Sequence, residues 1–269
     1  MIDDTRNAGR REEIDRNRKF MKSSDFDDVS FESDQGKKMP FPPLCKSAKG
    51  EVIELPADFD DILIHDAYSE LLDIRRSERV YDAKAPVTQN QLAFILWSTQ
   101  GIQKVVGRKY RTLRPVASAG ARHSFETYFI ARRVEGLAPG IYHYLPMEHV
   151  GEKRVAVEFW GDFPHPAEHL TKMLADQRWT KAAPVALFLS CVVYRAEWRY
   201  STFAHRAALI DLGHVGQNLM LSASALGLGS CCIAAYDQAL CDQTLGLDGQ
   251  EEYTVYAFTA GNHRQRKTG

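Results

Sequence analysis

The sequence predicts a protein that mixes α-helices with β-strands and has one long helix in its core. Three observations predict this class. Residues 203–226 are mainly apolar, with several small side chains among them. Residues 185–193 form an almost continuous apolar run, which is typical of a strand covered on both faces. Residues 127–134 and 140–145 flank a turn that contains Gly and Pro, which indicates a β-hairpin.

Length and composition exclude several classes of protein. The 269 residues are enough to bury a sizeable core. A net charge of −1 and a pI near 6.8 leave no basic excess to neutralise phosphates, which argues against nucleic acid as the main partner. No apolar run reaches membrane-spanning length without polar interruption, and the N-terminus has no apolar signal-peptide core. We expect a cytoplasmic protein without a membrane partner.

The cysteines are odd in number and lack the spacing of a disulfide framework, so we expect free thiols in a reducing compartment. They are Cys45, Cys191, Cys231, Cys232 and Cys241.

The N-terminal region differs in composition from the rest. Residues 1–38 are rich in charged side chains and poor in aliphatic ones. They form either a mobile tail or an arm that lies on a partner subunit. In the second case the anchors are Phe20, Met21, Phe26 and Phe31. Three nearby prolines, at positions 40, 42 and 43, mark an extended linker. We therefore predict a charged arm and Pro-rich linker over 1–58, followed by one folded domain over 59–269.

Two helices are predicted in the first half of that domain. Residues 60–75 carry apolar side chains near helical spacing. Residues 88–100 begin with Thr88 and Gln91 in the T-x-x-Q pattern of a capping box, and Gly101 is a plausible stop.

The long helix over 203–226 is predicted to be the central helix, near a subunit interface. It is apolar on most of its circumference, so it must be buried. Its polar residues, Asp211, His214, Gln217 and Asn218, rule out a simple membrane span. The remaining predicted elements are a strand at 154–160, a helix at 167–177 after Pro166, a buried segment at 230–236, a helix to 245 capped by Asp237, and a strand at 253–260.

An arginine cluster follows the first predicted helix. Arg75, Arg76 and Arg79 lie within five residues of one another, with Ser77 between them. The planar donor fork of Arg suits phosphate oxygens, and Ser adds a short donor. The cluster either forms a solvated turn or binds the phosphate and the polar ring edge of a cofactor.

A second candidate is the small-residue loop over 114–123. Small residues let the backbone approach a flat ligand closely, and a hydroxyl adds a hydrogen bond. The alternative is an ordinary loop that precedes a strand. The residues concerned are Ser118, Ala119, Gly120 and Ala121.

Two further pairs of residues are candidates for the site. Arg199 and Tyr200 precede the long helix and either bind or protonate a substrate or form a surface pair. Arg264 and Arg266 either complete a phosphate site or belong to a solvated tail.

Several common kinds of site are missing from the sequence. There is no G-x-G-x-x-G after a strand, no P-loop, no G-x-S-x-G and no H-E-x-x-H. Cys231 and Cys232 lack a second pair at metal-binding spacing, and His165 and His169 lack a clear third ligand. We expect no metal site.

Together these motifs resemble the flavin-dependent nitroreductase superfamily, and within it the SagB-type dehydrogenase branch. Arg75-Arg76-Ser77-x-Arg79-x-Tyr81 is similar to its opening motif, and 114–123 is similar to R-P-V-P-S-A-G-A-R-H. The resemblance covers about residues 20–260. It includes the segments 33–35, 125–128, 139–144, 211–214, 217–219 and 226–229.

The resemblance implies an α+β fold with a central mixed or antiparallel sheet flanked by helices. It also implies a homodimer with FMN at the interface. Carried over by position, Arg75, Arg76, Ser77 and Arg79 would contact the phosphate, ribityl chain and pyrimidine edge. The loop from Ser118 through Ala119 and Gly120 to Ala121 would lie beside the flavin, often from the other subunit. The backbone near the reactive flavin nitrogen would come from Ile233, Ala234 and Ala235, and Arg264 or Arg266 would help with phosphate.

The implied function is an FMN-dependent oxidoreductase that acts on a small or peptide-derived substrate. One version reduces a small electrophile with NAD(P)H, and another oxidises an azoline of a modified peptide. The chain has Arg199-Tyr200 where azoline-oxidising members have Lys-Tyr, and Arg cannot serve as a base near neutral pH, which counts against the second. The chain also has Ala117 in place of a Pro. A third alternative is a flavin-binding subunit of a modifying complex without turnover of its own.

Overall fold

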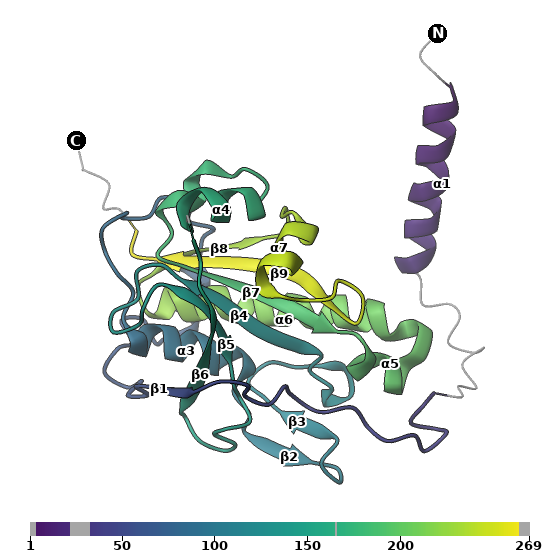
Figure 1. Ribbon diagram of the computed structural model, residues 1–269, viewed down its shortest axis with the longest axis horizontal. Helices are drawn as coiled ribbons and strands as arrows, with labels where there is room; N and C mark the ends of the chain where they lie inside the picture. Colours follow the sequence, from purple (N-terminus) through teal and green to yellow (C-terminus); the bar gives the residue numbers. More distant parts are fainter. Residues whose placement is uncertain (1–3, 22–32, 165, 264–269) are drawn as a thin grey trace.

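The computed structural model describes residues 4–21, 33–164 and 166–263 (Figure 1). Its main element is a seven-stranded sheet in the order β1-β6-β5-β4-β7-β9-β8, and every neighbouring pair is antiparallel. This confirms the α+β class with an antiparallel central sheet. The strands are β1 (Val52–Leu55), β4 (Phe125–Ala131), β5 (Gly140–Tyr144), β6 (Val155–Gly161), β7 (Val185–Val192), β8 (Gly229–Ile233) and β9 (Glu252–Gly261). A separate two-stranded sheet pairs β2 (Lys104–Val106) with β3 (Arg111–Leu113).

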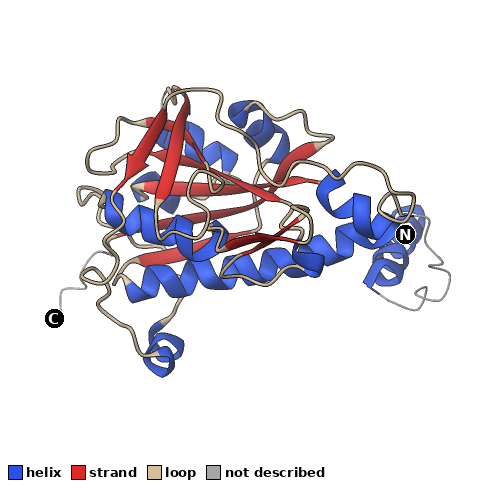
Figure 2. Cartoon of the chain, turned by 90° about the horizontal axis from the view of Figure 1, so that it is seen from below, coloured by secondary structure: helices blue, strands red, loops and turns tan. Residues whose placement is uncertain are grey.

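Helices cover both faces of the large sheet (Figures 1 and 2). One face packs against α3 (Gln89–Gln100) and α6 (Ala204–Ala225), and the other against α4 (Pro166–Met173) and α7 (Gln238–Leu245). Successive side chains of a strand point to opposite faces. Accordingly, Phe129 of β4 belongs to the first core, and its neighbours Tyr128 and Ile130 belong to the second.

The predicted hairpin and the predicted central strand are both present. In the hairpin, Tyr128 pairs with His143 and Ala131 pairs with Gly140. β7 lies between β4 and β9, and Val185 to Leu189 are almost fully buried along it. The apolar run of β7 is therefore explained by its coverage on both faces.

Helix boundaries follow the capping residues where the sequence offers them. The Thr88 side chain accepts a hydrogen bond from Gln91 N, and the Gln91 side chain accepts one from Thr88 N, which completes the capping box of α3. Asp237 caps α7 by accepting from Leu240 N at 3.0 Å. Both predicted caps are confirmed.

The predicted helix over 60–75 is shorter in the structure. Only α2 (Tyr68–Ile74) is helical. The backbone amides of Ile64 and His65 both donate to Ala225 O, at 2.8 and 3.1 Å. Because these amides bind the last turn of α6, they are not available for bonds within a helix.

The predicted long helix is confirmed, because α6 runs without interruption from Ala204 to Ala225. Two short elements precede it, α5 (Tyr194–Tyr200) and a 3₁₀ turn η4 (Ser201–Phe203). Ser201 has φ +45°, which interrupts the helical path between α5 and α6. α6 is not buried on every side in the single chain, because Leu209 and Ile210 are 56% and 52% exposed.

The N-terminal region contains an additional helix, α1 (Asp4–Met21), which the sequence did not predict. Its Arg, Lys and Glu residues are good helix formers even though they supply no apolar face. Phe20 is exposed, whereas Phe26 and Phe31 lie outside the described residues, so the docking arm stays a prediction. No helix in the described part of the chain is long and apolar enough to cross a membrane.

Candidate active site

The arginine cluster lies against the edge of the large sheet. Arg75 is the C-terminal cap of α2, and the chain then runs parallel to β8. Ser77 forms a bridge with Ser230, and Glu78 N donates to Ser230 O at 2.7 Å. Tyr81 anchors the end of the segment, since its hydroxyl lies 2.8 Å from Thr259 Oγ1 in β9. The cluster is thus fixed at both ends by the sheet.

The cluster has cationic groups with no acidic partner among the described residues. Arg76, Ser77 and Arg79 are exposed, and Arg75 is half-buried. The Arg75 guanidinium lies 4.0 Å from the sulfur of Met220 in α6, and that of Arg79 lies 5.9 Å from the ring centroid of Trp179. The nearby Glu78 carboxylate accepts from the backbone amides of Arg79 and Val80. Three guanidiniums that form no ion pair within the described residues favour an external anion.

The end of β8 lies beside this cluster. Parallel pairing at Ser77 and Ser230 sets Arg79 next to the last residues of β8. Ile233 is buried in the sheet, whereas Ala234 and Ala235, which follow it, are exposed. Ala235 O accepts from Gln177 Nε2 at 3.1 Å. The structure therefore places segment 75–79 along the strand that leads into 233–235.

The small-residue loop is held by a carboxylate on α6. Ser118 Oγ donates to Asp211 Oδ2 at 2.6 Å, and Ala119 N donates to the same carboxylate at 3.0 Å. Ser118 Oγ also accepts from His123 N at 2.9 Å, so the hydroxyl ties the loop together. Burial raises the pKa of Asp211, and the bonds from Ser118 and Ala119 only partly offset this.

The same loop contacts the Arg199–Tyr200 pair. Gly120 has φ +56°, and a Cβ there would lie 2.7 Å from Arg199 Nε and closer still to the Tyr200 hydroxyl. Gly120 is therefore required both by the backbone conformation and by this contact. Ala121 shares the left-handed conformation, with φ +54°.

Arg199 adds a second group of cations. Its guanidinium lies 5.5 Å from the Tyr200 ring centroid and has no carboxylate partner within the described ranges. Arg122 lies close by, almost fully buried, with its Nη2 atom unpaired. Burial, followed by the charges of Arg195 and Arg199, lowers the pKa of Arg122 to about 10.

The two groups of predicted residues lie at different points along α6. Arg75 touches α6 at Met220, and the small-residue loop binds it at Asp211. Nine residues of helix separate these positions, which is about 14 Å. The structure thus places 75–79 along β8, which leads into 233–235, and 118–121 against 199–200, and the two pairs of segments meet α6 at these separate positions. Arg264 and Arg266 lie outside the described residues.

No metal site is found among the described residues, where no group of three or more His, Cys, Asp or Glu has a metal-binding arrangement. All five cysteines are free. His169 Nε2 lies 2.8 Å from Thr244 Oγ1, and His165 is not among the described residues.

Comparison with known proteins identifies the family. The model of the nitroreductase family matches residues 72–262, which is most of the chain. The chain belongs to the nitroreductase family. As a member, it is an oxidoreductase. The matched region begins just before the arginine cluster and ends at the last strand of the sheet.

Two curated relatives support this membership. A protein of Methanocaldococcus jannaschii that carries the name of a nitroreductase is 32% identical over 184 residues, which cover 68% of this chain and 84% of that protein. The trifolitoxin-processing protein TfxB of Rhizobium leguminosarum bv. trifolii is 28% identical over 152 residues. That match covers 56% of this chain and 40% of TfxB. Similarity to TfxB agrees with the SagB-type branch of the nitroreductase superfamily.

A solved structure shares the nitroreductase fold. It is a nitroreductase-family protein of Ralstonia eutropha JMP134, with a TM-score of 0.62 and 18% sequence identity. The match covers 85% of this chain and 100% of that one. At this identity the likeness concerns the fold alone.

Sequence reasoning missed two features of this nitroreductase-family protein. The first is Asp211 as the residue that holds the loop, although an acid within an apolar helix was a visible signal. The second is a buried ionic network below the site. In it, Glu126 binds Arg195, His143 lies 3.1 Å from Glu126 and 3.0 Å from Glu158, and all four side chains are at most 2% exposed. Charged residues on otherwise apolar strands were the available signal.

Proposed function

We propose that the protein is an FMN-dependent oxidoreductase. The observation that carries the proposal is the set of guanidiniums of Arg75, Arg76 and Arg79, which form no ion pair in the described structure and belong to a segment that pairs with β8, the strand that leads into Ala234 and Ala235. This donor set fits a phosphate together with the polar edge of a planar ring.

In this proposal each predicted segment has a role in binding. Arg75, Arg76, Ser77 and Arg79 hold the phosphate, ribityl chain and pyrimidine edge. The backbone of 233–235 faces the reactive part of the ring, and Arg264 or Arg266 assists at the phosphate. When bound, FMN supplies the hydride or electron transfer, and the protein supplies binding, orientation and exclusion of water.

We further propose that the active unit is a homodimer. Loop 118–121 lies about 14 Å along α6 from the arginine cluster, so a second chain is needed to bring a copy of this loop beside the flavin. The exposed side of α6 offers an apolar surface for such a partner, centred on Leu209 and Ile210 and continued by Gly213. Changing Leu209 to Glu is expected to give monomers in light scattering, whereas Val52→Glu on β1 leaves the dimer intact. A wild-type monomer at micromolar concentration contradicts the proposal.

The preferred reaction is reduction of a small electrophile by NAD(P)H. Arg199 keeps its charge near neutral pH, so it binds an anionic or polar group and does not accept a proton. Oxidation of a peptide azoline is the second candidate, and the similarity to the trifolitoxin-processing protein favours it.

The absorbance spectrum of the purified protein separates these possibilities. Flavin bands that bleach anaerobically after NADPH is added support the reductase. Flavin bands that persist with NADPH but bleach with an azoline peptide support the dehydrogenase. Bands that persist with both indicate a flavin-binding subunit without turnover, and no flavin bands after incubation with FMN refute the proposal.

A further inference from the structure

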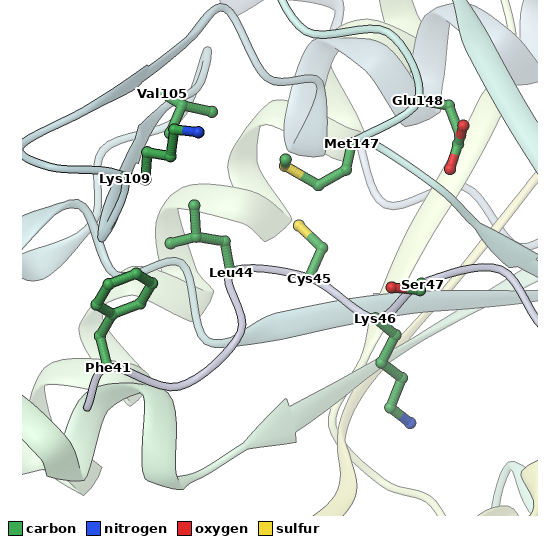
Figure 3. Close-up of a pocket in the computed structure, with 9 residues that line it drawn as sticks. All are labelled: Phe41, Leu44, Cys45, Lys46, Ser47, Val105, Lys109, Met147 and Glu148. Atoms are coloured by element: carbon green, nitrogen blue, oxygen red, sulfur yellow. The ribbon is translucent and has the colours of Figure 1, made fainter.

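A second cavity lies away from the arginine cluster, between three segments of the chain. We call it the strap pocket, because the extended segment 39–47 forms one of its walls (Figure 3). The other walls come from the β2–β3 hairpin and from the turn after β5. Its volume is about 560 Å³, within the range of about 300–1,000 Å³ that is typical of ligand sites. It is lined by Phe41, Leu44, Cys45, Lys46, Ser47, Val105, Lys109, Met147 and Glu148.

The lining of the strap pocket is mainly apolar, and part of it is exposed at the mouth. Leu44 and Cys45 form the buried floor, at 9% and 7% exposure. Phe41 and Met147, on opposite walls, are 45% and 39% exposed. Exposed large apolar side chains around a concave site mark a binding surface. The cavity therefore suits an apolar side chain that enters from solvent.

The two lysines of the pocket differ in their partners. Lys46 points away from the cavity toward the sheet (Figure 3), where it forms an ion pair with Glu252 and donates to Tyr128 Oη at 2.8 Å. Lys109 is exposed on the hairpin and has no ion pair within the described ranges. The one acid of the lining, Glu148, lies on the far side of the cavity from Lys109 (Figure 3). Of the two lysines that line the pocket, Lys109 is thus the one available to a ligand.

The wall that carries Lys109 is strongly basic. Between residues 103 and 114 the sequence contains Lys or Arg at five positions and no acid. Of these, Lys104, Arg108 and Lys109 are exposed, and none of the three has a carboxylate partner among the described residues. Positive charges spread along a hairpin match a ligand with several negative charges along its length. A small carboxylate would use only one of them.

We propose that the strap pocket binds an acidic peptide segment that inserts an aromatic or branched apolar side chain between Phe41 and Met147. Its carboxylates lie along the hairpin at Lys104, Arg108 and Lys109. An extended peptide also fits the outer edges of the two-stranded sheet, which pair with no further strand in the described sheets. This site shares no residue with the proposed flavin site, so the proposal does not depend on flavin binding.

The test uses fluorescence anisotropy of a fluorescein-labelled twelve-residue peptide in which Asp and Glu alternate with Leu and Phe. We expect saturable binding that weakens as salt is raised, because exposed charges are screened. Lys109→Glu is expected to weaken binding about ten-fold, since it removes one favourable charge and adds a repulsive one. Lys172→Glu, an exposed lysine on α4, makes the same charge change away from the pocket and is expected to leave the affinity unchanged.

A second variant tests the apolar part of the site. Met147→Asp places a carboxylate at the mouth and is expected to reduce binding by at least ten-fold. A peptide with Ala in place of Leu and Phe should bind weakly to the wild type. Equal affinity for the Lys109→Glu and Lys172→Glu variants overturns the proposal, as does preferential binding of a single-stranded oligonucleotide over the peptide.

The chain itself contains an acidic, aromatic sequence, Asp25-Phe26-Asp27-Asp28-Val29-Ser30-Phe31-Glu32. Changing Phe26 and Phe31 to Ala in the full chain tests whether this segment is the occupant. An unchanged peptide affinity supports an external partner. An affinity for the peptide that rises ten-fold or more shows that the chain's own segment competes with the peptide for the pocket, which overturns the proposal of an external partner.

Discussion

The ion pair between Glu126 of β4 and Arg195 of α5 is buried, and breaking it should be costly. The two side chains are 1% and 2% exposed. Glu126 also accepts from Lys46 N at 2.8 Å and lies 3.1 Å from His143 Nε2. Glu126→Gln keeps the shape of the side chain but leaves the buried Arg195 guanidinium without its carboxylate. Removing one partner of a buried pair typically lowers the free energy of unfolding by roughly 3–5 kcal/mol.

Urea unfolding followed by tryptophan fluorescence at pH 7 measures this loss. The matched control is Glu168→Gln, because Glu168 pairs with Lys181 at 3.6 Å on the surface, where the two side chains are 67% and 50% exposed. An exposed pair of this kind contributes at most about 1 kcal/mol. If Glu126→Gln and Glu168→Gln lower the free energy of unfolding by the same amount, the buried pair does not stabilise the fold as we argue.

The loss of stability caused by Glu126→Gln should also depend on pH. Burial raises the pKa of Glu126, but Arg195 and His143 outweigh burial and hold this pKa below its usual range. The contribution of an acid with a lowered native pKa is present above its unfolded pKa, about 4.3, and is lost as pH falls through the native value. The stability difference between the wild type and Glu126→Gln should therefore shrink below about pH 4. A constant difference from pH 7 to pH 3 would refute this reasoning.

Three further predictions follow from local geometry. Gly120→Ala should lower the free energy of unfolding by about 1–3 kcal/mol, because the added Cβ is strained in the left-handed conformation of this residue and meets Tyr200. The control in the same urea assay is Gly161→Ala, since Gly161 has open space around it. Asp211→Ala should cost about 1–3 kcal/mol in that assay, since two donors of loop 118–121 lose their acceptor; a cost below 0.5 kcal/mol, roughly that of a surface change, would contradict this. With Ellman's reagent at pH 8, the thiols of the native protein should react far more slowly than those of the urea-unfolded protein. Four of the cysteines are buried, and burial raises the pKa of the fifth, Cys232, to about 11. Rapid reaction of several thiols in the native protein would contradict this burial.

The strands and caps were predictable because their signals are local. The apolar run of β7, the hairpin turn and the capping box of Thr88 each depend on residues close in sequence. The shortened α2 was not predictable, because Ile64 and His65 find their hydrogen-bond acceptor at Ala225, far along the chain. The periodicity of nearby residues cannot reveal a distant acceptor that competes for these backbone amides.

The candidate site was predictable as a list of residues, but its assembly was not. The sequence identified Arg75–Arg79, Ser118–Ala121 and Ile233–Ala235 as separate motifs. The contact of Gly120 with Arg199 and Tyr200, and the role of Asp211 in holding the loop, depend on how α5, η4 and α6 follow one another. The interruption at Ser201, with φ +45°, has no clear signal in the sequence.

The most direct test of the central claim compares the affinities of FMN and riboflavin, which differ by the phosphate. In calorimetric titrations of apoprotein, we expect FMN to bind about ten-fold to a hundred-fold more tightly, as charge-assisted hydrogen bonds to a phosphate allow. The Arg79→Ala variant should lose much of this preference, whereas Arg178→Ala should keep it. If the wild type binds both ligands equally, or if the preference survives in Arg79→Ala, then the arginine cluster does not hold the phosphate.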